Sequence, residues 1–230
     1  MAEVELLNMR GWNEETGIVS MAFDRWKLTD AEIRAFCRLT IDVVHAEYAK
    51  RWEELGQEPS DPDGPDMETI FHERIHGLWP HDFEWMLLAA VWKDAVTAFE
   101  VYLEQGAQEV LKRNGLKVAM KGDGRGLSWS ELASFYRAAL QVHIDTPSVR
   151  DIRDLRHILT HNRGEWRSDQ QRKRFDEGID GCFPTYRVEL TRGKVEAACD
   201  CLAMLIRTVD PHVWTYSWGG KRLLEADELQ

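Results

Sequence analysis

Apolar side chains recur at helical spacing from Asp82 to Arg113, and this pattern limits the possible fold more than any other feature. Every third or fourth position is apolar, as on the buried side of an α-helix. The members of the series are Phe83, Met86, Leu87, Ala90, Val91, Ala95, Ala98, Phe99, Tyr102 and Leu103. The segment predicts one long helix that packs within a bundle, so we expect α-helices to dominate the chain.

Helix-capping signals predict further helices on both sides of this segment. Thr29-Asp30-Ala31-Glu32 has the form of a capping box and predicts a helix that runs to about Leu55. Ser128-Trp129-Ser130-Glu131 has the same form and predicts a helix to about His143. Thr146-Pro147 places a threonine at the N-cap and a proline at the first helical position, which is typical of a helix start.

Three further elements follow from local patterns. Met67 to Leu78 reads as a short helix that Gly77 and Pro80 end. Phe183 to Leu190 alternates as a strand does and predicts a hairpin. Thr191 caps a last long helix from Lys194 to Val209. The fold class that we expect is therefore mainly α, a helical bundle with a small β-hairpin insertion before the last long helix.

One stretch has the composition of a linker. Residues 57–66 (QEPSDPDGPD) are rich in proline, aspartate and glycine. We therefore expect an N-terminal helical extension and linker over residues 1–66, followed by a helical domain over residues 67–230.

Composition excludes some classes of protein. The longest apolar run, Met86 to Trp92, is far below the ~18 residues of a membrane-spanning helix, so we expect no membrane partner. The start, Met1-Ala2-Glu3-Val4-Glu5, is not that of a secretory signal. The four cysteines lack Cys-x-x-Cys spacing and read as reduced thiols. These features favour a cytoplasmic protein.

The charge is unevenly distributed along the chain. The net charge of −11 argues against indiscriminate binding to nucleic acid. Residues 150–174 nevertheless hold eight Lys and Arg against four Asp and Glu, a local charge of 8 − 4 = +4, so the other residues carry −15. Such a basic segment on an acidic protein suits a ligand that bears phosphate, although a solvated helix face explains it equally well.

The helix that Thr146-Pro147 opens carries a distinctive polar side. At about 100° per residue, its apolar positions gather on one side and its cationic positions on the other. The apolar positions are Val149, Ile152, Leu155 and Leu159, and the polar ones are Arg153, Arg156, His157, Thr160 and His161. Arg156 and His161 lie about 140° apart around the axis and border the polar side. Asn162-Arg163-Gly164 predicts the helix end, with glycine as the C-cap.

The segment from Ile144 to Gly164 resembles the signature helix of HEPN domains, which are α-helical proteins of prokaryotic defence systems and toxin–antitoxin pairs. Their motif is an arginine, often followed by a polar residue, and then a histidine four to six residues later. Arg156, His157 and His161 fit this motif. The resemblance covers about residues 82–209, and residues 1–80 lie outside it.

The resemblance implies a metal-independent endoribonuclease with no cofactor, whose cleft forms where two copies of the helix meet in a homodimer. His161 would then remove the proton from a ribose 2′-OH, and Arg156 would neutralise the charge that builds on the phosphate. The supporting residues would be His157, Asn162 and Glu100, the last either pairing with an arginine of this helix or remaining a solvated carboxylate. The resemblance also implies an antitoxin or defence-system partner.

We expect contacts to RNA from Arg153, Arg163 and Arg167, which are three of the eight cations of the basic segment. Two other interpretations remain open. The same helix occurs in proteins that only bind nucleic acid or a partner protein. In addition, His72-Glu73-Arg74-Ile75-His76 matches the His-Glu-x-x-His pattern of zinc hydrolases, with Glu100 as a conceivable third ligand. Gly77 and Pro80 weaken this reading because they end the helix directly after the second histidine.

Overall fold

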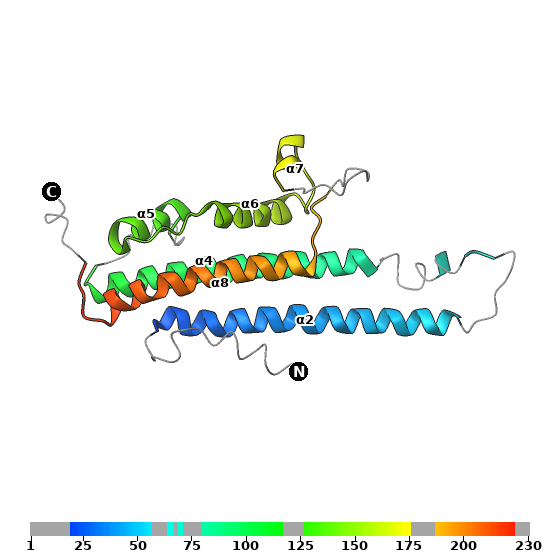
Figure 1. The fold of residues 1–230 in the computed structure, drawn as a ribbon, viewed down its shortest axis with the longest axis horizontal. Helices are drawn as coiled ribbons and strands as arrows, with labels where there is room; N and C mark the ends of the chain where they lie inside the picture. Colours follow the sequence, from blue (N-terminus) through cyan, green and yellow to red (C-terminus); the bar gives the residue numbers. More distant parts are fainter. Residues whose placement is uncertain are drawn as a thin grey trace. The chain divides into compact units, whose positions relative to one another are not determined.

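The computed structural model describes residues 19–56, 64–66, 69–70, 80–116, 127–175 and 187–223 (Figure 1). Within these ranges the long elements are all α-helices and no strand forms, so the mainly α fold is confirmed. The helices are α2 (Met21–Gly56), α4 (Pro80–Arg113), α5 (Trp129–Leu140), α6 (Pro147–His161), α7 (Asp169–Phe175) and α8 (Arg192–Ser217). Among the described helices, none is long and apolar enough to cross a lipid bilayer.

The chain divides into two compact units. Unit 1 comprises Met1–Ala31, Ala95–His157 and Ala197–Gln230, and unit 2 comprises Glu32–Asp94 and Ile158–Glu196. The boundary that the sequence predicts between residues 66 and 67 lies next to positions outside the described ranges and stays a prediction.

Helices α4 and α8 lie side by side in unit 1 (Figure 1), where the Tyr102 hydroxyl donates to Asp210 Oδ1 at 3.1 Å. Their facing residues include Phe99, Leu103, Ile206 and Val213, none of which exposes surface. Tyr136 of α5 is equally buried, and its hydroxyl donates to the Leu103 carbonyl at 2.8 Å. Burial of these apolar side chains stabilises the unit, and the two tyrosines satisfy their polar ends within it.

The first turn of α2 corrects one prediction. α2 begins at Met21 and not at Thr29, because Ser20 Oγ accepts from the Phe23 N–H at 3.0 Å as an N-cap does. Thr29 lies inside the helix, where its hydroxyl donates to the Arg25 carbonyl at 3.4 Å. The helix extends upstream because Phe23 and Trp26 bury their rings in the core of unit 1, 5.5 Å apart.

The other described capping predictions are confirmed. Ser128 and Glu131 form the complete capping box of α5, which ends at a left-handed Gln141. Thr146 Oγ1 accepts from the Val149 N–H at 3.3 Å at the start of α6, and Thr191 Oγ1 accepts from the Lys194 N–H at 3.2 Å at the start of α8. α4 begins and ends within two residues of its predicted bounds.

α8 continues beyond its predicted end at Val209, through Pro211, to Ser217. The extra turns bury Val213, which exposes no surface, so packing outweighs the hydrogen bond that the proline cannot donate. Of the expected hairpin, only residues 187–190 are described. Among them Arg187 forms an isolated antiparallel bridge with Glu165. The short helix predicted over Met67–Leu78 also lies outside the described residues, except for its helical positions 69–70.

Candidate functional site

Helix α6 has the two sides that its sequence predicts. Val149, Ile152, Leu155 and Leu159 are buried, and Ile158 joins them at 1% exposure. On the other side His157, Thr160 and His161 are exposed, whereas Arg153 and Arg156 are half-buried. Residues up to His157 belong to unit 1, and those from Ile158 onward belong to unit 2.

In unit 1, Arg153 joins α6 to α4 and α5. Its Nε donates to Glu100 Oε1 of α4 at 2.8 Å, and its guanidinium lies 3.7 Å from the centre of the Trp129 ring of α5. Trp129 in turn donates through Nε1 to Asp145 Oδ1 at 3.1 Å. A cation on an aromatic face beside a carboxylate is a stable arrangement, and it fixes how α6 is rotated.

These contacts give Glu100 the arginine partner that was one of its two expected environments. They also hold the Arg153 guanidinium against α4 and α5, so this residue positions α6. The contact between Arg153 and RNA stays a prediction, and of the three arginines assigned to RNA it is the least exposed, with 24% of its side chain accessible.

In unit 2, the end of α6 forms a tight turn at Gly164. Arg163 and Gly164 have φ of 54° and 82°, and the Gly164 N–H donates to the Ile158 carbonyl at 3.2 Å. Glycine adopts such a conformation without strain, so Gly164 takes part in ending the helix as predicted, although Arg163 is the first left-handed residue after it. The turn orients the exposed Arg163 and the half-buried Asn162, which directly follow His161.

Trp85 of α4 holds this turn in place, a contact that the sequence did not predict. A Cβ atom on Gly164 would lie 2.5 Å from the Trp85 ring. The indole Nε1 donates to the Val188 carbonyl at 2.7 Å, and the Val188 N–H donates to the Gly164 carbonyl at 2.8 Å. Arg187 covers the same ring at 4.6 Å. Only the glycine itself signals such a close approach in the sequence.

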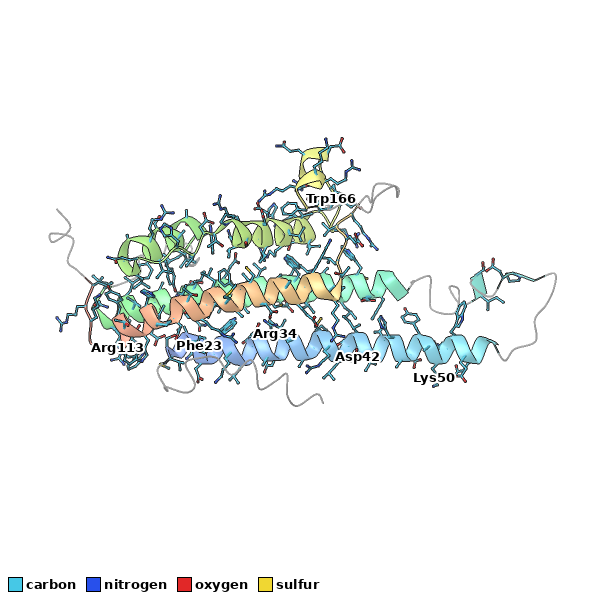
Figure 2. All side chains as sticks on the ribbon, in the orientation of Figure 1. Phe23, Arg34, Asp42, Lys50, Arg113 and Trp166 are labelled. Atoms are coloured by element: carbon cyan, nitrogen blue, oxygen red, sulfur yellow. The ribbon has the colours of Figure 1, made fainter. Side chains whose placement is uncertain are left out.

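Beyond the turn, a short basic helix follows that was also not predicted. Ser168 caps α7 by accepting from the Gln171 N–H at 3.1 Å. The rings of Trp166, labelled in Figure 2, and Phe175 stack with centres 6.3 Å apart and close the segment on itself. The last turn of α7 carries three cations, Arg172, Lys173 and Arg174. Together with the exposed Arg163 and Arg167, they form a basic surface in unit 2, which we call the α7 patch.

Most residues of the proposed zinc-hydrolase motif lie outside the described ranges. His72, Glu73 and His76 are not among the described residues. Glu100, its conceivable third ligand, is paired with Arg153. In the part of the chain that the structure describes, no group of three or more His, Cys, Asp or Glu is arranged to hold a metal ion.

Comparison with known proteins gives no match: no protein family, no curated protein and no solved structure resembles this chain at a significant level.

Proposed function

We propose that the protein is a metal-independent endoribonuclease of the HEPN type, with Arg156 and His161 of α6 as its catalytic residues. The observation that supports the proposal is the polar side of α6, where a half-buried arginine precedes two exposed histidines on a helix capped at both ends. An arginine binds phosphate oxygens and keeps its charge at every physiological pH, while an imidazole exchanges protons near neutrality. Phosphate binding and proton transfer are what RNA cleavage requires.

The proposed reaction begins with removal of a proton from a ribose 2′-OH by neutral His161. The 2′-oxygen then attacks the adjacent phosphorus, and the bond to the 5′-oxygen of the next nucleotide breaks. Arg156 stabilises the charge on the non-bridging oxygens as the phosphorus becomes five-coordinate. The products are a 2′,3′-cyclic phosphate and a 5′-OH, and the leaving oxygen takes up one proton.

A second copy of α6 completes the proposed cleft, because one helix supplies one exposed catalytic imidazole. In a homodimer with α6 facing α6, the His161 imidazolium of the second copy protonates the leaving oxygen. His157 and Asn162 contact the phosphate or orient His161. The α7 patch, through Arg163 and Arg167, binds neighbouring phosphates. A defence or toxin–antitoxin role, with a protein partner that restrains the nuclease, belongs to the same proposal.

Cleavage of RNA by the purified protein tests the proposal. We expect activity that persists in EDTA and falls by ~10²–10⁴ in His161→Ala and Arg156→Ala, as is typical when a general base or a transition-state cation is removed. His143→Ala is the matched control, because this exposed histidine lies in the segment between α5 and α6 and has no proposed role. Circular dichroism verifies that each variant remains folded.

Three outcomes would redirect the assignment. Equal cleavage by wild type and folded His161→Ala ends the nuclease proposal. RNA binding without any cleavage favours the alternative of a binding module that uses the same α7 patch. Loss of activity in EDTA instead points to His72 and His76 as metal ligands.

A further inference from the structure

α2 has two opposite sides within unit 2. The inner side carries Cys37 and Ile41, which are 4% and 3% exposed. The outer side carries Phe36, Leu39 and Val43, which are 47%, 61% and 66% exposed. At about 100° per residue these three side chains lie within a stripe of about 60°. Three large apolar residues exposed in one stripe are uncommon on a protein that has no partner.

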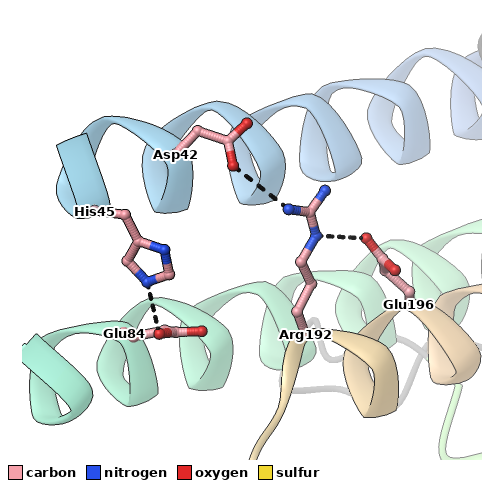
Figure 3. Close-up of polar contacts among 5 residues, drawn as sticks. All are labelled: Asp42, His45, Glu84, Arg192 and Glu196. Carbon is pink, nitrogen blue, oxygen red and sulfur yellow. Dashed lines mark hydrogen bonds and ion pairs between the residues drawn. The ribbon is translucent and has the colours of Figure 1, made fainter. Parts of the chain in front are cut away.

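Polar contacts fix which side of α2 faces inward. His45 Nε2 lies 2.9 Å from Glu84 Oε2 of α4, and Arg192 at the start of α8 lies 3.5 Å from Asp42 Oδ1 (Figure 3). Arg192 is held in turn by Glu196 at 2.9 Å. These pairs connect α2 to α4 and α8 along one side. Because these contacts fix the orientation of α2 about its axis, the stripe of Phe36, Leu39 and Val43 stays on the outer side.

The residues of the stripe are arranged symmetrically about its centre, which lies midway between Leu39 and Val43. Phe36 and Ala46 are equally far from this point, as are Glu32 and Lys50 at the two ends. Glu32, Ala46 and Lys50 are all exposed, and Lys50 is labelled in Figure 2. All six positions fall within about 80° around the helix axis.

A two-fold contact between identical helices requires that residues equidistant from its centre complement one another, and these pairs do so. When a second α2 runs antiparallel across the stripe, Leu39 meets Val43, Phe36 meets Ala46, and Glu32 meets Lys50. Each ion pair occurs twice. A parallel pairing in register would instead place Glu32 against Glu32 and Lys50 against Lys50, which is unfavourable.

We infer that the outer stripe of α2, from Glu32 to Lys50, binds the same stripe of a second copy of this chain in antiparallel orientation. A lipid surface fits the stripe less well, because the exposed Glu47, Glu53 and Glu54 beside it offset the charges of Arg51 and Lys50, with which Glu47 and Glu54 pair, and leave no excess of cations for anionic headgroups. This contact does not involve α6, so it goes beyond the proposed catalytic dimer and stands without it.

A charge-reversal series tests the register. In Glu32→Lys and in Lys50→Glu, two attractive pairs become two repulsive pairs, so we expect the dissociation constant of this contact to rise roughly tenfold in each. The double variant Glu32→Lys with Lys50→Glu exchanges the charges and should return within about threefold of wild type. Sedimentation equilibrium at low salt measures all four proteins. Single variants that match wild type, or a double variant weaker than both, overturn the antiparallel register.

An apolar substitution tests the contact itself. Val43→Asp should halve the assembled mass measured by light scattering, because it places a charge at the centre of the stripe. Met204→Asp is the matched control, since Met204 of α8 is equally exposed at 65% and lies outside the stripe. Circular dichroism verifies the fold of both. The inference is overturned if wild type has the mass of a single chain, 26.7 kDa, up to ~100 μM, or if folded Val43→Asp keeps the mass of wild type.

Discussion

Gly164 is the residue on which the end of α6 depends most. Its φ of 82° disfavours any side chain, and the Trp85 ring occupies the space where a Cβ would lie. Gly164→Ala should therefore reduce the free energy of unfolding by roughly 2–4 kcal/mol, because backbone strain and overpacking add. Chemical denaturation measures the loss. Gly193→Ala is the control, since a Cβ there meets no atom within 4 Å, and it should change stability by less than ~1 kcal/mol. Equal effects at both sites would mean that Trp85 does not hold the turn.

Asp210 is a second residue whose environment has a measurable consequence. Burial raises the pKa of its carboxyl above the ordinary 3.8, and hydrogen bonds from Ser20 and Tyr102 oppose part of that rise. A carboxyl whose pKa is raised by folding contributes most stability below pH 3.8 and loses it as the pH climbs toward the raised value.

The variant Asp210→Asn cannot titrate at this position. We therefore expect the stability of wild type, minus that of the variant, to decline as the pH rises from about 4. Its slope should not exceed ~1.4 kcal/mol per pH unit, the limit for one proton. Denaturation curves of both proteins between pH 3 and 7 provide the comparison. A difference that rises with pH would show that the hydrogen bonds from Ser20 and Tyr102 outweigh burial.

Elements were predictable from the sequence where their signals are local. The caps at Ser128, Thr146 and Thr191 act over three residues, so the sequence locates them without knowledge of the fold. Thr29 has the same local form, yet α2 passes through it because Phe23 and Trp26 pack against distant segments of unit 1. Tertiary packing overrides a capping signal when it makes the preceding turn helical.

The start of α2 offers a direct measurement of this override. Ser20→Ala removes the N-cap bond to the Phe23 N–H and the hydroxyl that Asp210 accepts from, so we expect a loss of roughly 1–3 kcal/mol of stability. Thr29→Ala should change stability by less than ~0.5 kcal/mol or increase it, because alanine suits an exposed position inside a helix. Thermal unfolding of the two variants decides between the two helix starts. A larger loss at Thr29 would restore the start that the sequence predicts.

The candidate site, like the helices, was predictable where its signals are local in the sequence. The polar side of α6 and the glycine at its end follow from helix geometry, whereas an arginine partner for Glu100 was one of two environments that the sequence left open. The Trp85 contact with Gly164 and the stacking of Trp166 on Phe175 do not follow from the sequence, since each joins residues whose approach depends on how the chain folds between them. The sequence therefore gives the chemistry of the proposed site, and the structure adds the contacts that hold it.

At the scale of the whole molecule, the charge distribution limits where the proposed RNA ligand could bind. Residues 150–174 carry +4 while the remaining residues carry −15, so the proposed RNA binding would be confined to the α7 patch and its surroundings. A patch of this size accommodates few phosphates. We expect the logarithm of the association constant to fall with the logarithm of salt concentration with a slope of about −2 to −4, taking ~0.7 per phosphate for single strands.

Individual arginines should contribute separately to that slope. Arg163→Ala and Arg167→Ala each remove an exposed cation of the α7 patch. Each should reduce the magnitude of the slope by ~0.7, the contribution of one phosphate contact, and should weaken binding to all RNA sequences alike. Arg137→Ala is the control, because Arg137 is exposed on α5, outside residues 150–174. Fluorescence anisotropy of a labelled single-stranded RNA at several salt concentrations gives the four slopes. If both patch variants keep the slope of wild type, the phosphates lie elsewhere, and the α7 patch is better explained as a surface that meets an acidic protein partner.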